Sequence, residues 1–178
     1  MMNNARLGVG GQGIGVAEAA FQHSTEYALN RKQGKSTIQN KHGTIIDHAD
    51  VRRMLISMRA DIFASRSIEI ENAKAIDMAN ATGEPEWISK AAFLTPITKV
   101  FGTEIGINIS NLGVQIHGGM GFIEETGAAQ FSRDVRVTAI YEGTNGIQAM
   151  DLVGRKMMDN GETAVSYTHL TLPTIAKV

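Results

Sequence analysis

The stretch RLGVGGQGIGVAEAAF, residues 6–21, decides between two fold classes. Its glycines Gly8, Gly10 and Gly13 have the spacing G-x-G-x-x-G that binds dinucleotides in α/β proteins. That pattern requires a strand in front of it, because the phosphates lie where the strand turns into a helix. Only MMNNARL precedes Gly8, and it has no strand pattern. We therefore predict a helix that packs closely through its glycines, where another backbone or a cofactor comes near.

Apolar residues recur with helical spacing along most of the chain. In the first helix Ile14, Ala17, Phe21 and Ala28 follow one another at steps of three, four and seven. The sequence predicts helices over residues 5–32, from a cap at Asp47 to about Asn80, and over 86–113, 125–138 and 145–158, with a polar loop at 33–44 and a glycine-rich turn at 117–122. No alternating strand pattern appears before residue 163. The expected fold is all-α, an up-and-down four-helix bundle.

Composition narrows the class of function. The chain has 178 residues, 43% apolar and 20% charged, with a net charge of −1. Because no basic stripe is present, nucleic-acid binding has no electrostatic support. There is no cysteine, the five histidines form no ligand cluster, and no apolar run is long enough to span a membrane. We expect no metal site and, since no targeting segment is visible, a cytoplasmic protein.

The end of the chain differs from the rest. From about residue 163 the helical period is lost, and SYTHLTLPT, residues 166–174, resembles translated sequencing-adapter DNA. We expect residues 1–162 to form one helical domain and residues 163–178 to be a non-native tail.

Two motifs are candidates for a functional site. In QIHGGMGF, residues 115–122, Gly118 and Gly119 allow a ligand close to the backbone, and Gln115 offers a donor and an acceptor. A turn without a ligand explains the same residues. In IYEGTNGIQ, residues 140–148, Glu142 is either an exposed acid in a turn or a partly desolvated base beside Gly143. The residues alone leave both alternatives open.

The order and spacing of QIHGGMGF, SRD at residues 132–134 and IYEGTNGIQ resemble the C-terminal helical domain of flavin-dependent acyl-CoA dehydrogenases. The opening NNARLGVGGQGIGVAEAAFQHSTEYALNRKQGK, residues 3–35, resembles it as well. The likeness covers about residues 3–158, and it is strongest to the branch that includes 3-methylmercaptopropionyl-CoA dehydrogenase. This resemblance implies a four-helix bundle and α,β-dehydrogenation of an acyl-CoA thioester to the trans-2-enoyl-CoA.

The resemblance also implies roles for individual residues. Glu142 matches the base that removes the α-proton, while FAD accepts the hydride from the β-carbon. Gly143 and Arg6 match residues that contact the substrate. The residues that match FAD contacts are Arg31, Gln115, Gly118, Gly119 and Thr144. Arg31 matches an arginine that reaches the FAD of a neighbouring subunit, which implies a homodimer or homotetramer with electron-transferring flavoprotein as the electron acceptor.

Some features depart from the family. Gly34 directly follows Gln33, where many relatives have an aromatic residue before the glycine, and Gly146 stands where many have glutamine. The family's N-terminal helical and middle β-domains are absent from this sequence, so we expect the chain alone to bind FAD poorly and to have no turnover. Two alternatives remain: an acyl-CoA oxidase or flavin monooxygenase with the same helical domain, and a non-catalytic helical assembly module.

Overall fold

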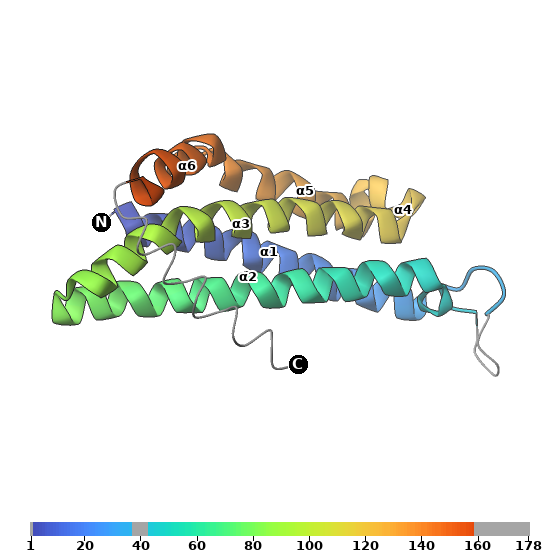
Figure 1. Cartoon of the computed structure of the whole chain (residues 1–178). Coiled ribbons are helices and arrows are strands. Elements are labelled where there is room, and N and C mark those ends of the chain that lie inside the picture. Colours follow the sequence, from blue (N-terminus) through green and yellow to red (C-terminus); the bar gives the residue numbers. More distant parts are fainter. Residues whose placement is uncertain (1, 37–42, 159–178) are drawn as a thin grey trace, which may run out of the picture.

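Three long helices form the body of the structure, a computed structural model that describes residues 2–36 and 43–158 (Figure 1). They are α1 (Met2–Asn30), α2 (Ala49–Thr82) and α3 (Pro85–His117). Shorter elements complete the chain: η1 (Ile45–Asp47), α4 (Gly119–Phe122), η2 (Glu124–Thr126), α5 (Ala128–Val135), η3 (Arg136–Ala139), α6 (Asn145–Asp151) and the π-helical η4 (Leu152–Met157). No strand occurs in the described ranges, so the all-α prediction is confirmed.

The three long helices lie side by side, and the segment from α4 to α6 returns along α3 (Figure 1). α1 packs mainly on α3, while α2 contacts both of them. α5 rests on α1 and α3, and α6 rests on α3 near the start of α1. The returning segment therefore completes a four-helix bundle, as the sequence predicts. Residues 37–42 and 159–178 lie outside the described part, as does the predicted tail.

α1 and α3 cross at backbone contact through glycines. A methyl group built on Gly13 would lie 2.4 Å from the carbonyl oxygen of Gly102, and one on Gly102 would lie 2.6 Å from that of Gly10. Gly106 similarly faces the carbonyl oxygen of Gly13 at 2.7 Å. No side chain fits at such distances, because contacts below 3.0 Å require the backbone itself to move. The stretch that spells a dinucleotide pattern is thus a helix-packing surface, as predicted.

The main core lies around this crossing. It contains buried alanines of α1, such as Ala17 and Ala20, and larger side chains of α2 and α3, such as Met58, Ile62 and Ile109. Small residues on α1 allow close approach, and large residues on its neighbours fill the remaining space. A second, smaller cluster, Ala75, Ile76 and Ala91, lies where α2 turns back into α3.

Several predicted boundaries are wrong in informative ways. Asp47 does not cap the second helix: it is buried in η1, and His48 occupies the cap position without a side-chain hydrogen bond. α3 continues past residue 113 to His117, and residues 119–122 form a helical turn instead of an open loop. The predicted helix 125–138 divides at Gly127, whose φ of 74° interrupts it, and again after Val135.

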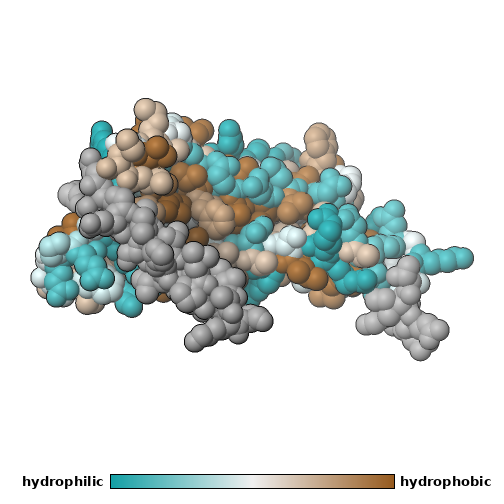
Figure 2. Space-filling model, viewed as in Figure 1, coloured by the Kyte–Doolittle hydropathy of each residue, from teal (hydrophilic) through white to brown (hydrophobic). Residues whose placement is uncertain are grey.

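Apolar side chains remain exposed on two outer faces. On α2, Ile56, Phe63 and Ile70 repeat at intervals of seven residues and are more than half exposed. Around α6 the exposed apolar residues include Ile147 and Met150, and Figure 2 shows apolar side chains gathered over that end of the molecule. The described helices therefore leave apolar surface uncovered beside the turn that carries Glu142.

The glycine crossing predicts opposite effects of two neighbouring substitutions. Gly13→Ala places a methyl group against the Gly102 backbone and should destabilise the chain by about 1–3 kcal/mol. Gly15→Ala meets no atom within 4 Å and, as a better helix former, should stabilise it by up to about 1 kcal/mol. Urea unfolding followed by circular dichroism measures both. Equal effects of the two substitutions would contradict close α1–α3 packing.

Candidate functional site

The predicted site residues fall into two groups at opposite ends of the α1–α3 pair (Figure 1). Arg31 follows the end of α1, and Gly118 and Gly119 follow the end of α3. Arg6 lies near the start of α1, where the turn bearing Glu142 leads into α6. Arg6 and Arg31 are separated by roughly 37 Å along the helix, at 1.5 Å per residue. The two groups are therefore two sites.

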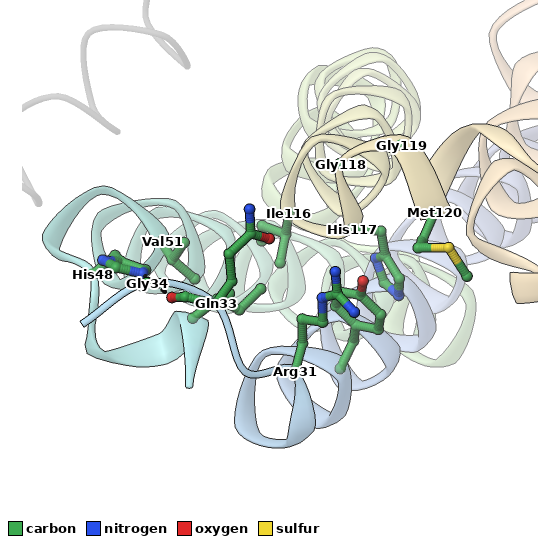
Figure 3. Close-up of a pocket in the computed structure, with 12 residues that line it drawn as sticks. Arg31, Gln33, Gly34, His48, Val51, Ile116, His117, Gly118, Gly119 and Met120 are labelled. Carbon is green, nitrogen blue, oxygen red and sulfur yellow. Dashed lines mark hydrogen bonds between the residues drawn. The ribbon is translucent and has the colours of Figure 1, made fainter. Parts of the chain in front are cut away.

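The first site is a cavity of about 710 Å³ between the end of α1, the start of α2 and the α3–α4 turn (Figure 3). Arg31, Gly118 and Gly119 all line it. The Arg31 side chain points toward His117 and the glycine turn in Figure 3. Gly118 has a φ of 61°, which exposes backbone at the cavity wall. A guanidinium beside a glycine turn that lacks side chains is an arrangement that suits a phosphate-bearing ligand.

His117 and Tyr27, which the sequence reasoning did not select, form the inner wall of this cavity. The two rings stack with centroids 4.2 Å apart, and His23 stacks on the other side at 4.8 Å. His117 Nδ1 donates to the Gly113 carbonyl oxygen at 2.7 Å, so its Nε2 is an acceptor, and that atom is buried without a partner. Burial lowers the pKa of His117, partly offset by the Gly113 hydrogen bond and reinforced by His23.

His48 also lines the cavity, and Gln115 does not. His48 Nε2 donates to the Gln33 carbonyl oxygen at 2.9 Å and so holds the segment after α1 against the start of α2. Gly34 packs on the His48 ring, since a methyl group built on Gly34 would lie 3.3 Å from that ring. Gln115 is exposed on α3 outside the cavity lining. The structure therefore does not bring the Gln115 side chain into the cavity that Arg31, Gly118 and Gly119 line.

The second site is the turn between η3 and α6, which carries Glu142. Glu142 has a φ of 53°, and among the described residues other than glycine it alone has a positive φ. Gly143 follows with a φ of 86°. A left-handed conformation costs a residue with a side chain roughly 1–2 kcal/mol, so the surrounding contacts must enforce it. Glu142 is exposed, and the described helices supply none of the desolvation that a base requires.

Contacts from both sides fix this turn. Tyr141 donates its hydroxyl hydrogen bond to the side chain of Gln12 on α1. Thr144 caps α6 by accepting from the amide of Ile147 at 3.4 Å. The fully buried side chain of Gln148 lies under Gly143, where a methyl group would come within 2.6 Å of Nε2. Thr144 thus has a structural role as a helix cap in addition to its predicted cofactor contact.

Arg6 lies beside α6, in a second cavity of about 290 Å³ that Ile147 and Met150 also line. Its Nη1 lies 3.8 Å from Asp151 Oδ2, and both side chains are largely buried. Arg6 Nε is buried without a partner. Arg6 thus lies close to the turn of Glu142, as a substrate contact requires, with part of its hydrogen-bonding capacity unused.

α3 also carries a buried polar stripe that the sequence reasoning missed. Thr95, Lys99, Thr103 and Ser110 are all at most 1% exposed. Their spacing of four, four and seven, which places them on one face of the helix, is the pattern that could have revealed them. Lys99 donates from Nζ to Asn145 Oδ1 at 2.8 Å, at the first residue of α6.

Two absences hold for the described part of the chain. Residues 2–36 and 43–158 contain no group of three or more His, Cys, Asp or Glu side chains placed to hold a metal ion. None of the helices in those ranges is long and apolar enough to cross a membrane.

The buried His117 predicts a loss of stability in acid. Its ordinary pKa is 6.5, and burial lowers the folded value. As the pH falls below 6.5 the unfolded chain binds a proton that the folded chain does not, so the free energy of unfolding decreases. His117→Phe should retain ring stacking and flatten the change of melting temperature between pH 7.5 and pH 5.5. His48→Gln is the control, and an equally steep change in the wild type and His117→Phe would contradict the assignment.

Comparison with known proteins identifies the domain. Residues 1–158 match the family profile "Acyl-CoA dehydrogenase, C-terminal domain". The 3-methylmercaptopropionyl-CoA dehydrogenase of Ruegeria pomeroyi is 47% identical over 98% of this chain and 31% of its own length. The caffeyl-CoA reductase-Etf complex subunit CarC of Acetobacterium woodii is 35% identical over 84% of this chain and 35% of its own length. The chain thus spans about a third of these relatives.

A solved structure agrees with the sequence comparisons. The acyl-CoA dehydrogenase of Bacillus anthracis complexed with FAD superimposes with a TM-score of 0.78 at 28% identity, over 90% of this chain and 28% of that one. The chain therefore belongs to the acyl-CoA dehydrogenase family, in which it corresponds to the C-terminal helical domain.

Proposed function

We propose that this chain is the catalytic-base domain of a flavin-dependent dehydrogenase that converts an acyl-CoA thioester into the trans-2-enoyl-CoA. The observation that carries the proposal is the left-handed turn at Glu142, which contacts from α1 and α3 hold in place. Strained conformations of this kind persist where function requires a fixed side-chain direction. Membership of the family supports the reaction class.

Residues of this chain remove the α-proton of the substrate and contribute to binding the acyl-CoA. Glu142 removes the α-proton, whose bonding electrons become the new C=C bond as a hydride leaves the β-carbon. The backbone N–H of Glu142 faces the thioester carbonyl and stabilises the charge that develops on its oxygen. Gly143 leaves room for the acyl chain, and the Arg6 guanidinium, which lines the cavity beside α6, binds the CoA side of the substrate.

The cavity at the other end would hold the adenosine diphosphate part of FAD. Arg31 supplies a cation for the pyrophosphate, Gly118 and Gly119 leave space at the backbone, and the unpartnered His117 Nε2 offers a buried acceptor for a donor on the ligand. When bound, FAD supplies the hydride acceptor for the β-carbon. The likeness to a dehydrogenase complexed with FAD supports this assignment.

The distance between the two sites supports a homo-oligomer. One extended FAD is shorter than the roughly 37 Å between Arg6 and Arg31, so a single molecule does not serve both ends of the bundle. Thr144, beside Glu142, would then contact the flavin of its own subunit. The Arg31 cavity would accept the adenosine diphosphate part of a flavin from a second subunit. Because one relative is a subunit of a complex with Etf, electron-transferring flavoprotein is the proposed electron acceptor.

The exposure of Glu142 indicates that other domains complete the site. The apolar surface around Ile147 and Met150 borders the base and lies open in this chain. Covering it would desolvate the carboxylate and raise its basicity. The 178-residue chain alone is accordingly expected to bind FAD weakly and to oxidise no acyl-CoA.

Glu142→Gln should separate catalysis from cofactor binding. In a complete dehydrogenase containing this domain, the amide cannot accept the α-proton, so turnover should fall by at least about 10³-fold while FAD content is kept. Exchange of the α-proton with deuterated water should be lost as well. Glu125→Gln, an exposed acid outside the turn, is the control. Retained exchange in Glu142→Gln would place the base elsewhere.

Arg31→Met should weaken FAD binding without changing the base. Loss of a pyrophosphate contact should raise the FAD dissociation constant of the assembled enzyme by about tenfold or more, equivalent to about 1.4 kcal/mol. The control is Arg53→Met, because Arg53 is exposed and pairs only locally with Asp50 in the described structure. Flavin fluorescence on titration measures both. Equal affinities of the two variants would remove Arg31 from the flavin site.

A further inference from the structure

We infer that Lys99 is a positioning residue for the turn that carries Glu142, and that it acts through the side chain of Asn145. The inference rests on the proposed function for its catalytic meaning, since the turn matters to the reaction only if Glu142 is the base. The contact itself is a property of this chain.

Lys99 lies where a lysine is rarely found. Its side chain is 0% exposed in the middle of α3, below the start of α6. Buried ammonium groups are costly unless they are paired. The hydrogen bond that meets this cost goes to a neutral amide oxygen, Asn145 Oδ1 at 2.8 Å. Burial lowers the pKa of Lys99, Glu104 opposes that effect, and Arg6 adds to it.

The Asn145 side chain connects a cation to an anion. Its Oδ1 accepts from Lys99, and its Nδ2 donates to Glu104 Oε1 at 2.7 Å. The hydroxyl of the fully buried Thr103 lies 3.1 Å from Nδ2, between the two charged groups. Because Lys99 is a donor and Glu104 an acceptor, the amide oxygen of Asn145 points toward Lys99 and its NH2 group points toward Glu104. Asn145 is consequently held on α3 in one orientation.

Asn145 is the residue through which this hold reaches the base. It is the first residue of α6, and the left-handed Glu142 and the following Gly143 lie directly before its cap, Thr144. On the other side, Tyr141 is bound to Gln12 of α1. The turn is therefore fixed at two points, and Lys99, together with Thr103 and Glu104, supplies the one on α3. Loss of Lys99 would weaken this attachment and let Glu142 leave the left-handed region more often.

A double-mutant cycle on the full chain tests the contact directly. The readout is hydrogen exchange of the Ile147 and Gln148 amides, which bond to Thr144 at the start of α6. Lys99→Met and Asn145→Ala should each speed this exchange by about tenfold, and the double variant no further, since both remove the same contact. Ser110→Ala removes a buried hydroxyl bond elsewhere on α3 and should leave these amides unchanged. The inference would be overturned if the increases in exchange rate multiplied in the double variant, or if Lys99→Met had no effect on exchange.

A second readout serves if Lys99→Met does not fold. In Asn145→Ala, Lys99 loses the acceptor that stabilises its charged form, so its titration by ¹³Cε NMR should move to lower pH. An unmoved titration would overturn the inference. In a complete dehydrogenase, Asn145→Ala should lower kcat by about tenfold with KM little changed. If Glu142→Gln leaves turnover intact while the exchange cycle holds, the proposed function fails and the anchoring contact stands.

Discussion

The contact between the backbones of α1 and α3 is the constraint on which the rest of the structure depends. Gly10, Gly13, Gly102 and Gly106 bring the two helices so close that neither can rotate or slide without a backbone clash. Both sites are positioned by this pair. α1 carries Arg6 and Gln12 and delivers Arg31, while α3 carries Lys99 and ends at the cavity. The positions of both sites are therefore inherited from one helix crossing.

The two ends of the pair differ in how complete they are. The cavity beside Arg31 has walls from α1, α2 and α3, and its polar groups are already oriented by hydrogen bonds such as that of His48. The turn of Glu142 is fixed just as firmly, yet its carboxylate faces outward beside apolar surface. The Arg31 end has a formed cavity, whereas the Glu142 end has an oriented carboxylate that no described residue covers. A domain that works only inside a larger assembly would show this asymmetry.

Much of the fold could be predicted because helical periodicity is local. The three long helices, the glycine-packed first helix and the break near Gly83 follow from spacing and from punctuating residues. What failed depends on partners distant in sequence. The burial of Asp47, the orientation of the Asn145 amide and the left-handed Glu142 are each set by contacts across the bundle. The role of Lys99 could not be predicted for the same reason, because its spacing is visible in the sequence but its partner Asn145 is distant in the chain. Family resemblance supplied the residues that spacing could not.

The glycine crossing also bears on the order in which the chain acquires structure. Gly10 and Gly102 belong to the first and third helices, so their contact closes a long loop that includes all of α2. Such closure is slow compared with the pairing of helices adjacent in the chain. α2 is adjacent in the chain to both of its neighbours, whereas the α1–α3 contact joins helices that have all of α2 between them. We therefore expect the α1–α3 contact to form late in folding, so that the two sites at its ends become ordered together.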